Sequence, residues 1–212
     1  MVGPDSPVSP DVVRCCLERA RASGYRSVLT NAVTASESEV FVDAGFSVRE
    51  RLHLLARDLH EEPPVPAQYP NATPDARVER AGRRDRAAVL ELDAAAFDTF
   101  WQLGNIGLAD ALGATPANRF RVVREGDVIA GYAITGHAGE HGYVQRLAVD
   151  PATRRRGLGR VLVADGLRWL WRHGATRVFV NTQLDNRAAF ALYESLGFAP
   201  LPVGLYVLGR PL

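Results

Sequence analysis

The pattern of apolar and polar positions divides the chain into a series of short helices and strands. Apolar side chains recur at helical spacing across residues 83–97, which predicts a helix there. Residues 119–124 and 128–135 are typical of two strands joined by a tight turn at Glu125-Gly126-Asp127. The pattern then predicts, in order, a strand at 142–149, a helix at 157–172, a strand at 177–182, a helix at 186–196 and a strand at 201–208. Helices first, a strand meander next and alternating strands and helices last indicate a mixed α/β (α+β) fold around one central sheet.

A proline-rich segment separates a shorter N-terminal part from this longer part. The stretch after His60 holds five prolines and few core residues, which is typical of a linker. We therefore expect three segments: residues 1–60, a linker at 61–75, and a complete domain at 76–212.

The N-terminal part resembles the end of the C-terminal part. Residues 24–31 resemble 174–181, and a Gly-Phe pair that ends a helix recurs as Gly45-Phe46 and Gly197-Phe198. Because helix, strand, helix and apolar strand follow in the same order, we interpret residues 1–60 as a partial repeat. The alternative is two ordinary helix–strand units whose helices both end at a glycine cap.

Composition and charge exclude several classes of partner. The net charge of +1 gives no long-range reason to expect nucleic acid or an anionic membrane as a partner.

No apolar run reaches the roughly 18 residues of a membrane span, and residues 1–10 do not resemble a secretory signal, so we expect a cytoplasmic protein. The adjacent Cys15 and Cys16 lack further ligands nearby, so we expect packing residues and no metal site.

Residues 147–160 carry the most informative chemistry. A strand ends at Val149, and Gly157 and Gly159 then open an apolar helix. Glycine lets a ligand approach the backbone, and a helix N-terminus binds phosphate through its unpaired N–H groups. Four arginines in and beside this turn add charge and forked hydrogen bonds, so we expect a pyrophosphate ligand. The Gly-Lys-Ser/Thr of an ATP loop is absent, and leucine replaces the third glycine of a dinucleotide motif, which leaves coenzyme A.

Two motifs in this part of the sequence resemble those of the GNAT superfamily of N-acetyltransferases. Residues 154–159 match its Q/R-x-x-G-x-G/A signature, and residues 186–198 match its N-x-x-A-x-x-x-Y-x-x-x-G-F helix. The resemblance covers about residues 77–212. With the N-terminal repeat, the chain is similar to a shortened form of the tandem-GNAT arrangement found in enzymes such as mycothiol synthase.

The resemblance implies a GNAT-type central mixed sheet flanked by helices, with acetyl-CoA as acyl donor and no metal. It implies that Tyr193 is the general acid that protonates the leaving thiolate, which is sensible chemistry for a thiol pKa of about 8.5. It also implies a set of cofactor-binding residues, namely Leu147, Ala148, Val149, Arg154, Arg155, Arg156, Gly157, Leu158, Gly159, Arg160 and Asn186.

The general base stays unassigned at this stage. Family members often carry a carboxylate on the strand that binds the cofactor, but the inward positions here are Tyr143 and Gln145, which are poor bases. Glu140 is the candidate base, and His137 and His141 are alternatives in the same loop, which contains glycine.

For the acceptor amine, one segment combines aromatic side chains with a carboxylate. Asp98 is expected to pair with a cationic amine, and Phe97 or Trp101 to stack on it, with Tyr143 and Gln145 also facing the substrate. The alternative is an aromatic helix end that packs on the sheet.

The sequence therefore predicts a bacterial-type N-acetyltransferase that moves an acetyl group to a primary amine by direct attack. The acceptor is a small molecule or a peptide. Alternatives are transfer of a longer acyl group, or a non-catalytic acyl-CoA-binding sensor or partner subunit.

The N-terminal copy has Thr34 and Phe41 where the C-terminal copy has Asn186 and Tyr193, so we expect the N-terminal copy to bind no coenzyme. Acceptor identity, acyl length and oligomeric state stay open, a homodimer among the options.

Overall fold

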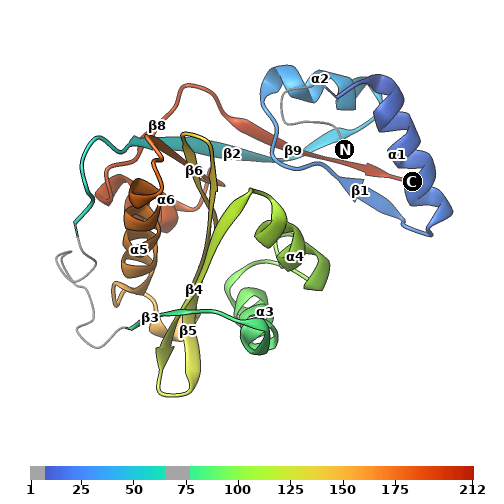
Figure 1. Ribbon diagram of the computed structural model, residues 1–212. Helices are drawn as coiled ribbons and strands as arrows, with labels where there is room; N and C mark the ends of the chain where they lie inside the picture. The colour runs from blue at the N-terminus through green and yellow to red at the C-terminus, as the bar shows by residue number, and fades with distance from the viewer. Residues whose placement is uncertain (1–7, 65–76) are drawn as a thin grey trace. The chain divides into compact units, whose positions relative to one another are not determined.

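The computed structural model describes residues 8–64 and 77–212 (Figure 1). Most of the predicted linker at 61–75 lies outside these ranges. The described residues form two compact units, which divide the chain differently from its linear order. The first unit combines the residues up to Leu55 with residues 181–190 and 200–212, and the second combines residues from Ala56 to Val180 with 191–199. The predicted boundaries at 1–60 and 76–212 stay a prediction.

The first unit is a three-stranded antiparallel arrangement with two helices. Its elements are α1 (Pro10–Ala22), β1 (Ser27–Leu29), α2 (Ala35–Asp43), the first part of β2 (Ser47–Asp58) and β9 (Leu205–Pro211). β9 pairs with both β1 and β2, so the C-terminal strand of the chain lies between two N-terminal strands. The buried core of the unit consists of Val13, Leu17, Phe46 and Leu208.

The two cysteines do not contribute to this core. Cys15 and Cys16 are exposed free thiols on α1, so the expectation that they are packing residues is wrong. The helix buries Val13 and Leu17, which lie four residues apart on one face, and the cysteines fall outside that stripe.

The second unit contains the predicted central sheet. Its elements are β3 (Val78–Arg80), the 3-10 turn η2 (Arg83–Asp85), α3 (Arg86–Ala96), α4 (Asn105–Gly113), β4 (Ala117–Glu125), β5 (Val128–Ala138), β6 (His141–Val149), η3 (Pro151–Thr153), α5 (Leu158–Arg172), most of β7 (Arg177–Gln183) and the end of α6 (Arg187–Ser195). The strands follow the order β7-β6-β5-β4-β3. Only β6 and β7 are parallel within this set, so the sheet is mixed and flanked by helices, as predicted.

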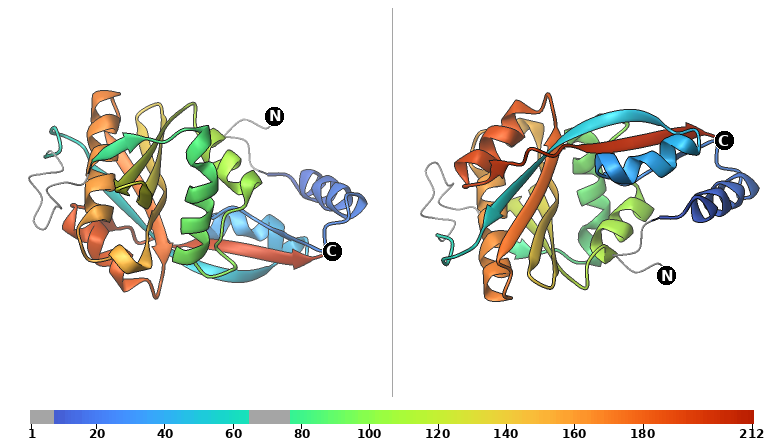
Figure 2. Two further views of the ribbon diagram at one scale, coloured as in Figure 1. Left: turned by 90° about the horizontal axis from the view of Figure 1, so that it is seen from below. Right: turned by 90° about the horizontal axis from the view of Figure 1, so that it is seen from above.

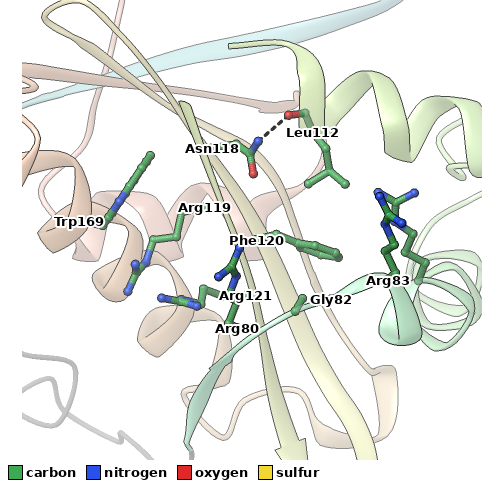
Figure 3. Close-up of a pocket in the computed structure, with 11 residues that line it drawn as sticks. Arg80, Gly82, Arg83, Leu112, Asn118, Arg119, Phe120, Arg121 and Trp169 are labelled. Carbon is green, nitrogen blue, oxygen red and sulfur yellow. Dashed lines mark hydrogen bonds between the residues drawn. The ribbon is translucent and has the colours of Figure 1, made fainter. Parts of the chain in front are cut away.

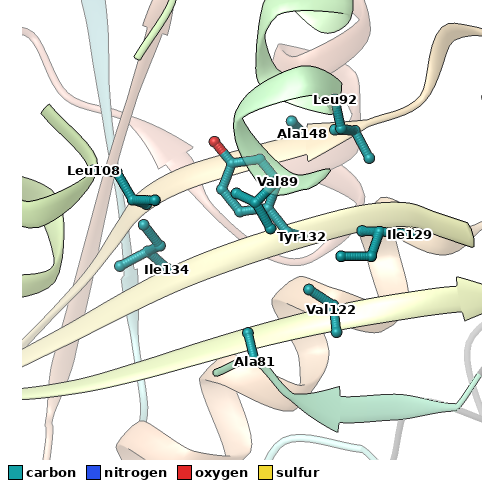
Figure 4. Packing of buried hydrophobic residues seen from close by; sticks show 9 residues of the cluster. All are labelled: Ala81, Val89, Leu92, Leu108, Val122, Ile129, Tyr132, Ile134 and Ala148. Atoms are coloured by element: carbon teal, nitrogen blue, oxygen red, sulfur yellow. The ribbon is translucent and has the colours of Figure 1, made fainter. Parts of the chain in front are cut away.

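The period of two along the strands places a separate core on each face of this sheet. On one face α3 and α4 cover a cluster around Tyr132, in which Val89, Leu92 and Ile134 are buried (Figure 4). On the other face α5 covers Ala133 and its neighbours through its own buried leucines, Leu158 and Leu162. Figure 2 shows α3 and α5 on opposite sides of these strands. The consecutive residues Tyr132 and Ala133 therefore serve different cores.

The C-terminal strand begins later than the pattern predicts. The expected strand at 201–208 is observed as a short pairing, β8 (Ala199–Pro200), followed by β9 (Leu205–Pro211). Pro202 and Gly204 lie between them, and both residue types interrupt regular strand pairing. The other predicted elements of the second unit are present, with ends that differ by a few residues.

Helix α5 approaches the sheet closely because glycines face it. A Cβ added at Gly166 on α5 would lie 2.6 Å from the hydroxyl oxygen of Thr135 on β5. A Cβ at Gly142 on β6 would lie 2.5 Å from a methyl carbon of Leu170 on α5. Real Cβ atoms do not approach other atoms this closely, so glycine sets the distance between α5 and the sheet at both points.

Strands β6 and β7 pair over only part of their length. Their parallel register runs from His141 opposite Arg177 to Val144 opposite Val180, although β6 continues to Val149. Directly after Val144, the β5–β6 register shifts by one residue at Gln145, which is a β-bulge. Because a bulge bends its strand and increases the local twist, it explains why β6 leaves β7 at this point. The backbone from Gln145 to Val149 lies beyond the last β6–β7 pair.

A buried ion pair fixes the residue that follows the bulge. Arg146 donates from Nε and Nη2 to the two carboxylate oxygens of Asp93 on α3, both at 2.8 Å. Asp93 is fully buried and also accepts hydrogen bonds from the backbone N–H of Leu103, at 2.7 Å, and from the hydroxyl of Tyr132. Burial, together with the hydrogen bond to Asp93, raises the pKa of Tyr132 above its ordinary value, so its hydroxyl stays protonated and donates. The Asp93 carboxylate on α3 thus links this helix to β5, to β6 and to the segment that precedes α4.

Gly166→Ala should lower the free energy of unfolding by about 1–3 kcal/mol, because the added methyl overpacks the contact with Thr135. Urea unfolding measures the change. Gly113→Ala is the matched control, since a Cβ there meets nothing within 4 Å. Equal stability of the two variants would contradict the close packing of α5.

Asp93→Asn should lower the free energy of unfolding by about 3 kcal/mol, because it leaves the largely buried guanidinium of Arg146 without a charge partner. Asp110→Asn on α4, an exposed aspartate, should change stability by less than about 0.5 kcal/mol. The same urea titration compares both. A loss of stability no larger in Asp93→Asn than in the control would show that the ion pair does not hold the fold.

Candidate functional site

The loop between β6 and α5 has an unusual backbone. Asp150 accepts a hydrogen bond from the N–H of Ala152 at 2.8 Å and thereby shapes the start of η3. Arg155 adopts φ 63° and is the sole non-glycine residue with positive φ in the described chain, and Gly157 follows at φ 79°. A non-glycine residue in the left-handed region costs free energy, and such positions cluster at functional sites.

This loop leads into the N-terminus of α5, which no side chain caps. Gly157 occupies the N-cap of α5, where the structure shows no side-chain hydrogen bond. The N–H groups of residues 158–160 belong to the first turn, which has no partners within the helix. The site therefore offers uncapped donors at the positive end of a 15-residue helix.

The arginines around the loop fall into two groups. Arg154 donates to the backbone oxygen of Ala96 at 3.1 Å, Arg156 forms an ion pair of 2.7 Å with Glu125, and Arg160 donates to the hydroxyl of Ser195 at 3.0 Å. Arg155 is exposed. The first group anchors the loop while adding positive charge to it, and Arg155 projects to solvent beside the helix N-terminus.

Gly159 brings three elements together at this place. A Cβ there would lie 3.3 Å from Leu192 on α6 and 3.6–3.7 Å from Val149 and Leu147 on β6. A larger residue would push α5 away from the end of β6. Three of the sequence-predicted cofactor residues, Leu147, Val149 and Gly159, are therefore neighbours.

Tyr193 lies in the same unit and is almost fully buried. Its side chain is 5% exposed, and its ring meets Phe198 edge to face with centroids 5.7 Å apart. Burial raises the pKa of Tyr193 above its ordinary value, and the positive charge of Arg146 offsets a part of this rise. The hydroxyl is therefore protonated at neutral pH, which a general acid requires.

Asn186 acts locally as a helix cap. Its side-chain oxygen accepts from the N–H of Ala189 at 3.1 Å, and its amide nitrogen lies 3.3 Å from the side-chain oxygen of Gln183. These contacts explain why α6 begins at Arg187. The cofactor contact predicted for Asn186 stays a prediction.

The strand residues expected to face the substrate have partners on the sheet. Tyr143 stacks on Phe179 with centroids 5.9 Å apart. Gln145 lies at the bulge, where its amide nitrogen is 3.5 Å from the hydroxyl of Thr115 and its buried side-chain oxygen has no hydrogen-bond partner within the described residues. Of these two residues, Gln145 therefore has a polar atom, its side-chain oxygen, that accepts no hydrogen bond from the described residues.

Glu140 is exposed in the turn between β5 and β6, and its backbone oxygen accepts from Thr176. It lies seven residues before Leu147, which corresponds to roughly 20 Å along an extended strand. Direct proton transfer needs hydrogen-bond contact, so the structure does not bring this candidate base to the end of β6. His141 is the first residue of β6 and contacts Phe179, whereas His137 on β5 contacts Trp169 and His173. The base stays unassigned.

The predicted acceptor segment is organised around Arg146. The guanidinium of Arg146 lies 3.6 Å from the ring centroid of Phe97 and donates to the backbone oxygen of Trp101 at 2.7 Å. Phe97 therefore already stacks on a cation of the protein. Asp98 is exposed, and Trp101 packs edge to face on Phe100. Asp98 and Trp101 remain candidates for amine recognition.

Sequence reasoning missed the pair of Asp93 and Arg146. The available signal was Asp93 itself, because it lies four residues after Val89 on the apolar face of its helix. A carboxylate on a buried face requires a partner. The partner was not identifiable, because Arg146 is 53 residues away in the sequence.

No group of three or more metal-ligating side chains was found in ranges 8–64 and 77–212. No helix among those residues combines the length and apolar character needed to cross a membrane.

Comparison with curated proteins finds acetyltransferases. The mycothiol acetyltransferase of Gordonia bronchialis is 35% identical over 140 residues, which are 62% of this chain and 45% of that protein. The ribosomal protein bS18 alanine N-acetyltransferase of Salmonella typhimurium is 40% identical over 72 residues, which are 34% of this chain and 49% of that protein. The chain thus matches about half the length of these relatives.

Comparison with solved structures supports the predicted tandem-GNAT arrangement at the level of the fold. A tandem GNAT protein from the clavulanic acid biosynthesis pathway aligns with 100% of this chain and 73% of its own, with a TM-score of 0.64 and 16% identity.

The match to a protein family covers the loop, α5 and α6 together. Residues 86–198 match the family described as acetyltransferase (GNAT), and this range contains both sequence motifs and the buried ion pair. Because the match spans more than half of the chain, the chain belongs to the acetyltransferase (GNAT) family.

Proposed function

We propose that this protein transfers an acetyl group from acetyl-CoA to a primary amine. The observation that carries the proposal is the uncapped N-terminus of α5 behind a loop in which Arg155 and Gly157 both have positive φ. Such a terminus binds phosphate through its N–H groups and its partial positive charge. The family membership supports coenzyme A as the source of that phosphate.

The residues present fit this ligand. The amides of the first turn of α5 and the guanidinium of Arg155 would hold the pyrophosphate, with Arg154, Arg156 and Arg160 adding charge. The backbone of Leu147 to Val149, which lies beyond the last pair with β7, would bind the pantetheine arm. Asn186 is proposed as a further contact. Bound acetyl-CoA supplies an activated thioester.

The proposed chemistry is direct transfer. The amine nitrogen attacks the thioester carbonyl carbon, the C–N bond forms, and the C–S bond breaks. A backbone N–H near Leu147 to Val149 would stabilise the oxyanion of the tetrahedral intermediate. Tyr193 would give its proton to the departing thiolate, and the proton lost by the amine passes to water or to a base that is not assigned.

The partial N-terminal repeat is proposed to have a structural role without coenzyme. In that copy α1 stands where α5 stands in the second unit, and its N-terminus is capped by Ser9, whose side chain accepts from the N–H of Val12. This cap occupies a donor that a phosphate would need.

The acceptor is proposed to be a small-molecule or peptide amine. The two named relatives differ in this respect, since one is a mycothiol acetyltransferase and the other acetylates an alanine of a ribosomal protein. Exposed Asp98 beside Trp101 is suited to a cationic amine of either kind. A cytoplasmic location fits a coenzyme A substrate and is part of the proposal.

Gly157→Trp should abolish acetyl-CoA binding, because the indole would cover the helix N-terminus. Calorimetric titration of acetyl-CoA into both proteins measures this. Gly174→Trp is the matched control, since Gly174 follows the other end of α5 with φ 84° and open space around its Cβ position. It should bind acetyl-CoA like the unchanged protein. Absence of binding to the unchanged protein would overturn the proposed function.

Tyr193→Phe should reduce kcat about 10²- to 10⁴-fold and leave acetyl-CoA affinity unchanged, because it removes the proton donor and retains the ring against Phe198. Release of free coenzyme thiol measures the rate. Since the pKa of Tyr193 is raised, the rate should not fall through deprotonation of this acid as pH rises to about 10, the ordinary tyrosine value. An unchanged kcat in the variant would exclude Tyr193 as the acid.

A further inference from the structure

A cavity at the β3–β4 edge of the second unit lies apart from the proposed cofactor loop (Figure 3). Its volume is about 650 Å³. The residues that line it are Arg80, Ala81, Gly82, Arg83, Arg86, Leu112, Asn118, Arg119, Phe120, Arg121 and Trp169. The cavity shares no residue with the loop at 154–160 or with α6.

The short length of β3 creates this cavity. β3 pairs with β4 only from Val78 to Arg80, and the last contact is the N–H of Ala81 donating to the oxygen of Phe120 at 3.1 Å. Asn118, two residues from Phe120, directs its backbone N–H and C=O to the same side of β4. The floor of the cavity is thus a strand edge with a further amide donor beyond the end of β3.

The walls of the cavity carry positive charge from both faces of the sheet. Five of its eleven lining residues are arginines, and none is acidic. In Figure 3, Arg119 and Trp169 lie on one side of β4, and Arg83 and Phe120 lie on the other. Since the whole chain has a net charge of only +1, this concentration is local.

The charges are only partly neutralised. Arg119 forms a forked pair with Asp165 on α5, at 2.6 and 2.9 Å, and Arg121 lies 3.6 Å from the same carboxylate. Arg80, Arg83 and Arg86 have no carboxylate within ion-pair distance among the residues that the structure describes. Among the described residues, Asp165 therefore pairs with two of the five guanidinium groups, and the other three have no carboxylate partner.

Arg121 shows the effect of this imbalance. Its buried Nε atom lies 3.6 Å from Oδ2 of Asp165, beyond hydrogen-bond distance, and has no closer acceptor among the described residues. Burial, and after it the positive charge of Arg119, lowers the pKa of Arg121. A buried donor without a partner costs free energy that an acceptor from a ligand would recover.

We propose that this cavity is a binding site for a small polyanion, a molecule that carries two or more phosphate or carboxylate groups. Each such group is an acceptor that matches the forked donors of arginine. The three unpaired arginines would bind the outer groups, and Arg121 with the edge amide of Asn118 would bind the inner one. The indole of Trp169 and the ring of Phe120 give the site apolar walls. The site is separate from the proposed acetyl transfer and does not depend on it.

The test uses the triple variant R80Q/R83Q/R86Q, because these exposed side chains hold no ion pair in the described structure and their replacement should not affect folding. Tripolyphosphate and citrate are titrated separately into the whole chain at low ionic strength by calorimetry. We expect at least one of them to bind, and the triple variant to bind it about tenfold or more weakly. Binding should also weaken with added NaCl.

Two controls assign the binding to this site. R14Q/R19Q/R21Q on α1 removes the same charge from exposed positions and should bind like the unchanged protein. Gly157→Trp, which covers the α5 N-terminus, should retain the anion. Affinity for tripolyphosphate over citrate would identify a phosphate ligand, and the reverse a carboxylate ligand. Absence of binding by both probes, an equal loss in both triple variants, or loss in Gly157→Trp alone would overturn the proposal.

Discussion

The ion pair between Asp93 and Arg146 is the interaction on which the arrangement of the candidate site depends. Its two hydrogen bonds of 2.8 Å join α3 to β6 one residue after the bulge. Arg146 also holds the ring of Phe97 and the backbone of Trp101, while Asp93 holds the N–H of Leu103. A buried carboxylate and a largely buried guanidinium stay charged only when their hydrogen bonds are satisfied, and here each is bound on several sides.

This constraint links the end of β6 to its surroundings. The bulge at Gln145 separates β6 from β7, and the ion pair then fixes the direction in which β6 continues. Gly159 allows the start of α5 and Leu192 of α6 to pack against that end. The loop at 154–157 is consequently held between fixed elements, which is how the backbone of Arg155 is kept in the left-handed region.

The sequence was sufficient for the elements of the second unit and for the loop. Apolar periodicity located α3, α5 and β4 to β7, and the two motifs located the N-terminus of α5 and Tyr193. Features that depend on distant residues were not predictable: the partner of Asp93, the bulge at Gln145 and the placement of β9 between β1 and β2. The arginine-lined cavity was also missed, because Arg80, Arg83 and Arg119 come together only through the early end of β3. Glu140 is adjacent to β6 in the sequence but lies in the turn before the strand, roughly 20 Å along it from the proposed reacting end.

The N–H groups at the start of α5 are proposed to bind the pyrophosphate of acetyl-CoA. Hydrogen–deuterium exchange measures those amides directly, with and without acetyl-CoA. Under this proposal, exchange of residues 157–160 slows when acetyl-CoA is added, while exchange in the first turn of α2, which Thr34 caps, does not change. Unchanged exchange at 157–160 in the presence of saturating acetyl-CoA would contradict it.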